Sequence, residues 1–281
     1  MPAKILDGKA VAKRIKDQLA AEFAALKAQG KLAKLVSLAV GSDDGTNSYR
    51  KSQLKQAEAL GVAYAMEDLR ADAPESAVVE KINMLNADKS VTGIILQMPV
   101  PKHLNGESLA KRIAPAKNIE GIDPVNLGSI VMKQYRNVPC TPRAAVELVI
   151  ESGIDLNGAN AVVIGRSTIV GKPAALLLLD KNCTVTICHS KSKNLPAICR
   201  NADILVTAIG TEAGMVKGDW VKPGAVVVDV GIIDIGGGKI RGDVDAESVS
   251  AVAGFLSPVP GGVGPVTVQM LYRNLLDALK A

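Results

Sequence analysis

The sequence predicts an α/β fold in two domains, on three observations. Short apolar segments alternate with longer segments of helical periodicity, which is typical of βαβ units around a largely parallel sheet. This alternation occurs in both halves of the chain, and 281 residues are enough for about two domains. Residues 161–179 read as a buried strand, a glycine turn and a helix, an order that forms a dinucleotide site. The second domain is therefore expected to be Rossmann-like.

The elements of the first half follow from periodicity. Residues 7–30 carry apolar side chains at helical spacing and end at a glycine, so they form the first helix. Two polar segments are expected to be irregular, 41–47 and 117–128. The other elements alternate as strand 35–40, helix 48–60, strand 62–66, helix 75–85 and strand 91–96.

The second half repeats the alternation after a proline-flanked junction at Thr141. A helix opens there and runs to about residue 152. An amphipathic helix at 266–279 ends the chain. Strands are expected at 160–164, 183–187, 203–207, 225–229 and 253–256, and helices at 171–180 and 194–201.

Composition limits the function classes. The chain has 33 Lys and Arg against 28 Asp and Glu, spread along its length, and 2% aromatic residues, which argues against a nucleic-acid partner. No apolar run reaches the roughly 18 residues of a membrane span, and the N-terminus shows no secretory or transit pattern. The four cysteines form no C-x-x-C pair, so we expect reduced core cysteines and no metal site. The expected location is the cytoplasm.

The glycine turn at 165–171 predicts contacts with a dinucleotide. Gly165 lets the backbone approach a pyrophosphate, and the loop continues through Arg166 and Ser167 to Val170 before the helix. A serine replaces the second glycine of G-x-G-x-x-G, so the motif is incomplete. A strand–helix turn without a ligand is the alternative interpretation.

The next strand predicts which dinucleotide is bound. It ends before Ser190 and Lys191, where NAD-binding proteins carry an acidic residue for the ribose hydroxyls. Together with Arg166, these hydroxyl and cationic groups favour a 2′-phosphate. NADP is therefore the predicted cofactor, with NAD as the alternative. An ordinary exposed loop would also explain the lysines.

Further glycine turns follow later strands. Gly210 follows one strand, and Gly231 with Ile232 follows another; small residues there let a ribose or nicotinamide lie against the backbone. The segment 258–267 is a stiff loop of prolines and glycines that either contacts a ligand or only turns the chain. Its candidate contacts are Pro260, Gly261, Gly262 and Thr267.

Taken together, these segments resemble the methylenetetrahydrofolate dehydrogenase/cyclohydrolase (FolD) family. The resemblance implies two domains around a cleft and a homodimer. It places a folate-binding catalytic domain at 1–138, completed by the C-terminal helix 266–281, and an NAD(P)-binding domain at 139–265. The matching segments run in order along nearly the whole chain: 40–61, 97–100, 139–142, 165–173, 229–232 and 260–265.

The resemblance implies oxidation of 5,10-methylenetetrahydrofolate to 5,10-methenyltetrahydrofolate with NADP. In the family, a lysine four residues after a folate-stacking tyrosine then supports hydrolysis of the methenyl group to 10-formyltetrahydrofolate. Here Tyr49 is followed by Gln53 at that position. Glutamine cannot exchange a proton near neutral pH, and Lys51 and Lys55 point about 200° away around a helix. Cyclohydrolase activity is therefore predicted to be weak or absent. A tyrosine at the edge of the core is the alternative for Tyr49.

Two more catalytic positions carry over. Gln97 matches the family and can orient the reacting centre by hydrogen bonding. Glu120 stands where the family usually has aspartate, so the carboxylate or the substrate must shift. Pro99 and Asp123 are further candidate substrate contacts, and Asp123 is otherwise a turn residue before Pro124. Two rivals stay open, a bifunctional enzyme and a non-catalytic dinucleotide-binding sensor.

Overall fold

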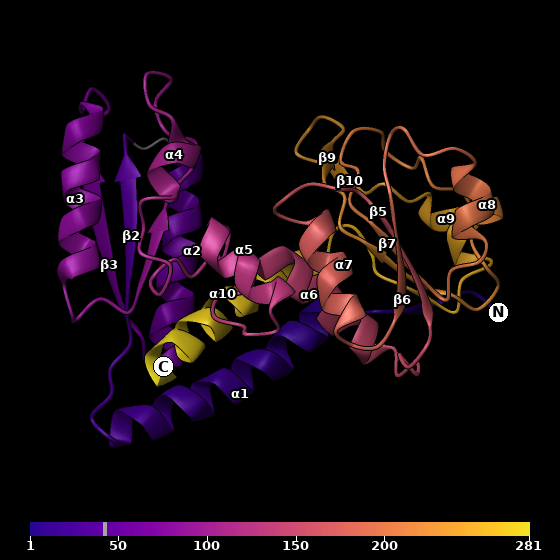
Figure 1. Cartoon of the computed structure of the whole chain (residues 1–281), viewed down its shortest axis with the longest axis horizontal. Coiled ribbons are helices and arrows are strands. Elements are labelled where there is room, and N and C mark those ends of the chain that lie inside the picture. Colours follow the sequence, from indigo (N-terminus) through magenta and orange to yellow (C-terminus); the bar gives the residue numbers. More distant parts are fainter. Residues whose placement is uncertain (42–43) are drawn as a thin grey trace. The chain divides into compact units, whose positions relative to one another are not determined.

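The computed structural model describes residues 1–41 and 44–281 and divides into two compact units. Unit 1 comprises Met1–Ile15 and Pro139–Met270, and unit 2 comprises Lys16–Val138 and Leu271–Ala281 (Figure 1). Residues 1–15, expected in the first domain, cluster with the second half because β1 pairs with a late strand of that half. No helix of the described residues has the length and apolar character needed to cross a membrane.

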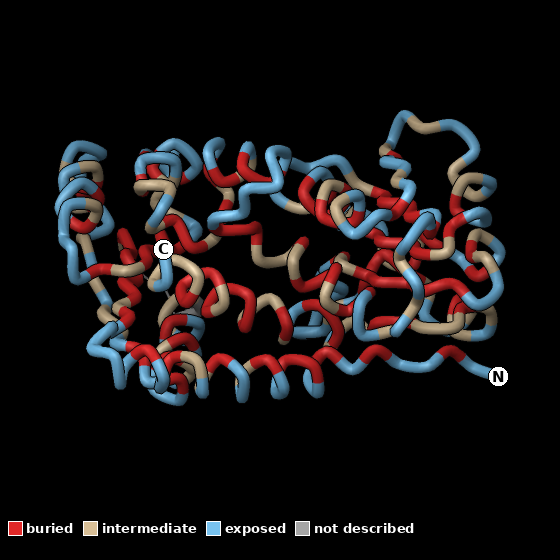
Figure 2. The backbone as a smooth tube through the Cα atoms, turned by 60° about the horizontal axis from the view of Figure 1, so that its bottom comes forward, coloured by how far each residue is buried: buried red, intermediate tan, exposed pale blue. Residues whose placement is uncertain are grey.

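Two long helices contribute residues to both units. They are α1 (Gly8–Ala28) and α10 (Val263–Lys280). Buried and exposed residues alternate along α1 at helical spacing, as the tube that runs from the N-terminus shows (Figure 2). Helix α1 therefore buries one face and leaves the opposite face in water, whereas almost every residue of α10 is buried or half-buried.

Unit 2 is built on a three-stranded parallel sheet in the order β3-β2-β4. The strands are β2 (Lys34–Val40), β3 (Ala63–Leu69) and β4 (Gly93–Leu96). Helices α2 (Asp44–Leu60) and α3 (Glu75–Ala87) connect them as crossovers. Because side chains alternate along a strand, β2 packs its apolar side chains against α3 on one face and turns a serine towards α2 on the other.

Helix α2 begins earlier than predicted. The loop prediction for 41–47 is wrong for residues 44–47, which form the first turn of α2. Residues 42 and 43 of that prediction lie outside the described residues. The polar composition of this first turn led to the prediction of a loop, although polar residues are also common at helix N-termini.

A further helix corrects the prediction that 117–128 is irregular. After the short α4 (Gly106–Ala110), the chain forms α5 (Pro124–Val131). Asp123 is its N-cap and accepts from the N–H groups of Val125 and Asn126 at 3.0 Å each. A capping aspartate followed by proline is a helix-start signal, so the sequence did carry this information.

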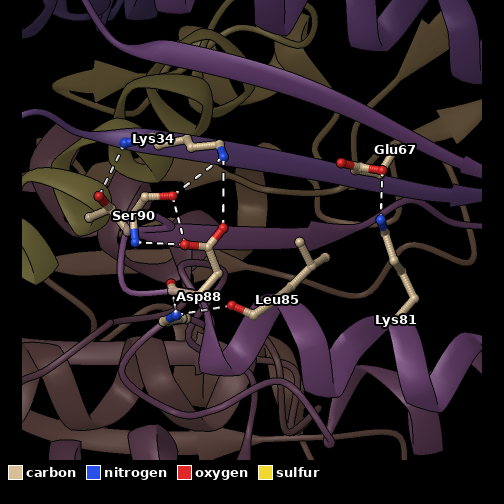
Figure 3. A network of polar contacts seen from close by, with 8 residues as sticks. Lys34, Glu67, Lys81, Leu85, Asp88 and Ser90 are labelled. Carbon is tan, nitrogen blue, oxygen red and sulfur yellow. Dashed lines mark hydrogen bonds and ion pairs between the residues drawn. The ribbon is translucent and has the colours of Figure 1, made fainter.

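Polar contacts attach the C-terminal end of α3 to the sheet (Figure 3). The Lys34 ammonium lies 3.5 Å from Ser90 Oγ and 3.9 Å from the Asp88 carboxylate, which accepts from the Ser90 hydroxyl at 2.7 Å. Lys117 donates to the carbonyl oxygens of Leu85 and Asp88 at 2.9 and 2.6 Å. The Leu85 carbonyl lies in the last turn of α3, where the helix supplies no donor, so Lys117 satisfies it and fixes its own segment beside α3.

Unit 1 holds a six-stranded sheet in the order β1-β11-β8-β7-β5-β6, with every pairing parallel. The order of the strands reverses at β5, because β6 pairs with one edge of β5 and β7 pairs with the other. Doubly wound sheets bind ligands beyond the strand ends at such a point. The strands are β1 (Lys4–Ile5), β5 (Asn160–Ile164), β6 (Thr184–Cys188), β7 (Ile204–Thr207), β8 (Val226–Asp229) and β11 (Phe255–Leu256).

The helices of unit 1 surround an apolar core that includes Cys188 and Cys199. All four cysteines are free, and burial raises the pKa of the Cys199 thiol to about 12, so this thiol stays protonated. The remaining elements are α6 (Cys140–Glu151), α7 (Gly171–Leu179), α8 (Leu195–Cys199), α9 (Ala246–Ser250), the 3₁₀ turn η1 (Gly218–Trp220) and the hairpin of β9 (Ile233–Asp234) and β10 (Ile240–Arg241).

Candidate functional site

A cavity of about 160 Å³ lies in unit 2 at the C-terminal end of β4. It brings together the four residues predicted as catalytic, which come from α2, the end of β4 and the segment before α5. The other side chains that line the cavity are aliphatic, together with the thioether of Met98. The lining residues are Tyr49, Gln53, Ile95, Leu96, Gln97, Met98, Glu120 and Leu271.

Helix α2 presents two of these residues on one face. Tyr49 and Gln53 are four positions apart and therefore neighbours on the helix surface. Tyr49 leaves half its surface exposed, whereas Gln53 is 2% exposed. Lys51 and Lys55 are exposed and do not belong to the cavity lining. Position 53, which is buried, thus carries a neutral amide, and the amines of Lys51 and Lys55 point away from it.

A hydrogen-bond network fixes the orientation of the Gln53 amide. Its Oε1 accepts from the Tyr64 hydroxyl at 2.8 Å and from Gln97 Nε2 at 3.1 Å. Gln97 Nε2 also donates to Ser37 Oγ at 2.9 Å. Gln53 Nε2 is buried and has no partner among the described residues. A buried donor without a partner is unfavourable by roughly 1–3 kcal/mol, so a ligand oxygen or nitrogen that accepts from it would bind favourably.

The supporting residues were not predicted from the sequence. The Arg50 guanidinium is 2% exposed and donates to Ser37 Oγ at 3.1 Å and to the Asp68 carboxylate at 2.5 Å. Arg50 thereby fixes α2 against β2 and β3 and holds Ser37 in place for Gln97. One signal was available, because Ser37 interrupts an otherwise apolar strand.

Glu120 is the one carboxyl among the described residues that line the cavity. The residue is half-buried, and burial of its carboxyl raises the pKa to about 7. Its segment lies against β4, where the Ile94 N–H donates to the Lys117 carbonyl at 2.8 Å. A Cβ at Gly93 would lie 2.6 Å from Ile119 Cγ2, so only glycine permits this close approach. A carboxyl with this pKa both donates and accepts protons near neutrality.

The structure does not bring the other two unit 2 candidates into the cavity lining. Pro99 is exposed and follows Met98 through a cis peptide bond. Asp123 is 2% exposed, and its carboxylate caps α5 and accepts from Asn126 Nδ2. This geometry favours the interpretation of Asp123 as a structural residue.

The predicted pyrophosphate turn of unit 1 is a tight connection from β5 to α7. Gly165 has φ +141°, and a Cβ there would lie 2.5 Å from the Ala208 carbonyl oxygen. A Cβ at Gly171 would lie 2.2 Å from the Gly165 oxygen, so the helix start packs directly on the turn. Ser167 Oγ accepts from the N–H groups of Val170 and Gly171 at 3.1 and 3.3 Å. The serine therefore organises the loop that a second glycine would otherwise form.

The residues predicted to bind a 2′-phosphate lie in turns that leave the sheet at the same edge as the glycine turn. Gly165 donates its N–H to the Cys188 carbonyl at 2.9 Å, so the turns after β5 and β6 start side by side. Arg166, Ser190 and Lys191 are all exposed in these turns. No acidic residue occurs at positions 189–193. The arrangement offers positive charge and a hydroxyl beyond the strand ends.

Two buried aspartates hold the later strand-end turns. Asp243 accepts from the N–H groups of Ile209 and Gly210 at 2.7 and 2.8 Å. Asp229 accepts from the Gly231 N–H at 2.9 Å, and burial raises the pKa of Asp229. A Cβ at Gly231 would lie 2.4 Å from Asp243 Cγ. Neither aspartate was predicted as a functional residue, although Asp229 lies two positions before the candidate Gly231.

The remaining candidates also belong to unit 1. Ile232 is 64% exposed, whereas Gly262 packs so closely that a Cβ at Gly8 would lie 1.7 Å from its carbonyl oxygen. Gly261 has φ +105°, and Pro260 follows a cis peptide bond. Thr267 Oγ1 donates to the Val263 carbonyl at 3.0 Å within α10. The loop at 258–262 is thus tightly packed against the start of α1.

The doubly wound sheet of unit 1, with its glycine turns at the switch point, defines a dinucleotide-binding α/β protein, and unit 2 adds a cavity lined by polar and apolar side chains. Residues 6–120 match the family model "Tetrahydrofolate dehydrogenase/cyclohydrolase, catalytic domain", and residues 139–281 match the corresponding "NAD(P)-binding domain". The chain belongs to the tetrahydrofolate dehydrogenase/cyclohydrolase family.

Known proteins agree with this assignment. "Bifunctional protein FolD" of Staphylococcus aureus (strain Newman) is 44% identical over 280 residues, which cover 100% of this chain and 98% of the relative. The crystal structure of a bifunctional FolD from Campylobacter jejuni has a TM-score of 0.92 at 38% identity and covers 99% of both chains. A Trypanosoma brucei FolD complexed with NADP and an inhibitor has a TM-score of 0.90 at 34% identity and covers 100% of this chain and 98% of its own.

These similarities confirm three predictions. The family, the two-domain α/β fold class and the class of NAD(P)-dependent dehydrogenase are as expected from the sequence.

Proposed function

We propose that this chain is an NADP-dependent methylenetetrahydrofolate dehydrogenase of one-carbon metabolism in which cyclohydrolase activity is weak or absent. One observation supports the second part most directly. Gln53 lies buried in the cavity with its amide oxygen held by Tyr64 and Gln97. Among the described residues that line the cavity, none carries an amine.

The cavity suits the ring end of a folate. Its volume of about 160 Å³ is below the roughly 300–1,000 Å³ of pockets that enclose a drug-sized ligand, so it takes one ring system and leaves the rest outside. The exposed ring of Tyr49 is available for stacking at the mouth. Gln53 Nε2 supplies a free donor and Glu120 a carboxyl. We assign Pro99 and Asp123 no direct contact with the ring.

Hydride transfer needs alignment more than proton exchange. Bound NADP supplies the hydride acceptor. The cavity residues orient the folate so that its methylene carbon is held in one position, and the hydrogen-bonded amides of Gln53 and Gln97 keep that orientation rigid. Loss of a hydride leaves a positive charge on the folate, and the ionised form of Glu120 stabilises that charge.

Hydrolysis of the methenyl group places a different demand on the cavity. General acid–base assistance is worth roughly 10²–10⁴-fold in rate, and an amide cannot provide it. The second candidate is the bifunctional enzyme, and it has one observation in its favour. The Glu120 carboxyl, with a pKa of about 7, has the acidity of a general base for water.

The turns of unit 1 fit a phosphorylated dinucleotide. Only glycine fits the close approaches at Gly165 and Gly231, and the exposed Arg166 and Ser190 can bind a 2′-phosphate. NADP in the T. brucei relative supports the same choice. The residues that we propose to hold the cofactor are Gly165, Arg166, Ser167, Val170, Ser190, Gly210, Gly231, Ile232 and Thr267.

We further propose a cytoplasmic homodimer. The strand β3 pairs with β2 on one side, and no partner strand lies on its other side in the part of the chain that the structure describes. The outer edge of β4 is bridged by Asn118 instead. An open edge of seven residues is a surface that proteins usually cover. Four free cysteines agree with a reducing compartment.

The function is tested by an absorbance assay with 5,10-methylenetetrahydrofolate and NADP, repeated with NAD. We expect reduced NADP and methenyltetrahydrofolate to appear in equal amounts, and the methenyl product to decay at the rate of the buffer alone. Faster decay would establish the bifunctional enzyme. Cofactor binding without any reduction would favour the non-catalytic sensor.

A further inference from the structure

The C-terminal helix α10 contributes one residue to the cavity lining and contacts the backbone near two others. Leu271 lines it directly. Tyr272 and Asn274 follow on the same helix, and both are 0% exposed. Each has a polar group that must find a partner inside the protein, because buried polar groups without partners are strongly unfavourable.

Tyr272 connects α10 to the helix that carries Gln53. Its hydroxyl donates to the Gln53 backbone carbonyl at 2.7 Å. Burial raises the pKa of Tyr272, with smaller contributions from Tyr64 and Tyr49, so the hydroxyl stays protonated and remains a donor. The contact therefore fixes the turn of α2 from which the Gln53 side chain enters the cavity.

Asn274 connects the same helix to the segment that carries Glu120. Its Nδ2 donates to the carbonyl oxygens of Ile119 and Val138 at 2.7 Å each, and its Oδ1 accepts from the Val138 N–H at 3.3 Å. Ile119 directly precedes Glu120. One buried amide thus joins both ends of the segment 119–138 and holds the Glu120 backbone at a defined place.

The contacts of Tyr272 and Asn274 differ from the ion pairs on the same helix in the groups that they join. Arg273 stands between the two residues and donates to Glu22 of α1 at 2.6 Å. Lys280 binds the same carboxylate at 2.6 Å. Arg273 and Lys280 therefore bind one carboxylate of α1, whereas Tyr272 and Asn274, about 200° apart around α10, bind the backbone at two different segments, one at Gln53 and one directly before Glu120.

We propose that Tyr272 and Asn274 are positioning residues that set the places of Gln53 and Glu120 on the two sides of the cavity. The proposal rests on the proposed function for the role of those two side chains, but the contacts themselves do not depend on it. Catalytic geometry has to be held within about 0.5 Å, and a displacement of about 1 Å is worth up to 10²-fold in rate. A hydrogen bond beside Gln53 and another beside Glu120 meet that need.

The test compares Tyr272→Phe and Asn274→Ala with the matched control Arg273→Met, which removes the ion pair between the two positions. We expect each test variant to raise KM for 5,10-methylenetetrahydrofolate or lower kcat by about 10-fold, with KM for NADP within twofold of the wild type. Arg273→Met should lower the melting temperature and leave all three constants unchanged. Asn274→Ser, which retains one donor, replaces Asn274→Ala if that variant does not fold.

A second readout requires no turnover. The ¹³C carboxyl signal of Glu120, assigned by its loss in Glu120→Gln, reports the titration of that group. Tyr49 is the other titratable residue that lines the cavity, and it is intact in every variant. The wild type should titrate near pH 7, Asn274→Ala at least one unit lower as the carboxyl reaches water, and Arg273→Met as the wild type.

The two readouts separate the proposals. A wild type that reduces no cofactor, together with an altered Glu120 titration in Asn274→Ala alone, would reject the proposed function and support the positioning role. Unchanged kinetic constants in both test variants, or an unchanged titration in Asn274→Ala, would overturn the positioning role. A change of equal size in Arg273→Met would overturn it as well, because the effect would then be one of general stability.

Discussion

Gln53 and Glu120 determine the chemistry of the cavity at the scale of single residues. A lysine at position 53 would place a cation in the same cavity as the Glu120 carboxyl and so lower its pKa. With glutamine there, burial acts unopposed and raises the pKa to about 7. Gln53 also leaves an amide donor without a partner in the cavity. Both features bear on how the cavity would hold a ligand.

A stability prediction follows from the Glu120 pKa. Between its ordinary value of 4.5 and about 7, the folded state binds more protons at this carboxyl than the unfolded state. Stability therefore falls as pH rises through this range, by about 3 kcal/mol in total. Glu120→Gln should remove this dependence and be the more stable protein at pH 8. Urea unfolding at pH 5 and pH 8 checks this, and an identical loss in both proteins would contradict it.

At the scale of elements, the sequence predicted long apolar segments best. The strands β5 to β8 lie within one residue of the predicted ranges, because β5, β7 and β8 are nearly continuous buried apolar runs and the edge strand β6 alternates threonine with apolar residues. The two-residue strands β1, β9 and β10 are too short to show any period. Helix α5 was missed because its polar and glycine residues obscure the helical pattern around the buried Ile130. The clearest sign of where the helix starts is its capping residue, Asp123.

The aspartate-held turns of unit 1 give a prediction for cofactor binding. Asp243 accepts from two backbone N–H groups, at Ile209 and Gly210. In Asp243→Asn, one oxygen becomes an amide donor that faces an N–H group, so one of these contacts is lost and the turn loosens. We expect KM for NADP to rise by about 10-fold while KM for the folate stays within twofold. The control is Asp219→Asn on the surface of the same unit. Equal effects on both substrates would count against this prediction.

At the scale of the whole chain, long-range contacts limited what the sequence could predict. The residues Tyr49, Gln53, Gln97 and Glu120 were identified through the resemblance of their segments to the family, and the structure places all four in one cavity. Their supports were not identified, because each depends on a partner far along the chain. Those supports are Ser37, Arg50, Tyr64, Tyr272 and Asn274.

The open edge of β3 leads to a prediction about assembly. If two copies pair through this edge, a charge placed on it should separate them. Met66→Lys, in the middle of β3 at a side chain that is 40% exposed, should convert a dimer into a monomer in light scattering after gel filtration. Ala87→Lys at the end of α3 is the control and should leave the dimer intact. A monomeric wild type, or a dimer that survives Met66→Lys, would show that β3 is not the interface.

The central claim is that Gln53 leaves the enzyme without cyclohydrolase activity. Its most direct test supplies 5,10-methenyltetrahydrofolate, without NADP, to the wild type and to Gln53→Lys, and follows the loss of methenyl absorbance against buffer. We predict no acceleration by the wild type and an acceleration of roughly 10²-fold or more by Gln53→Lys, because the amine restores general acid–base assistance. Hydrolysis by the wild type at a rate well above buffer would contradict the claim, and Glu120 would then be the first residue to replace.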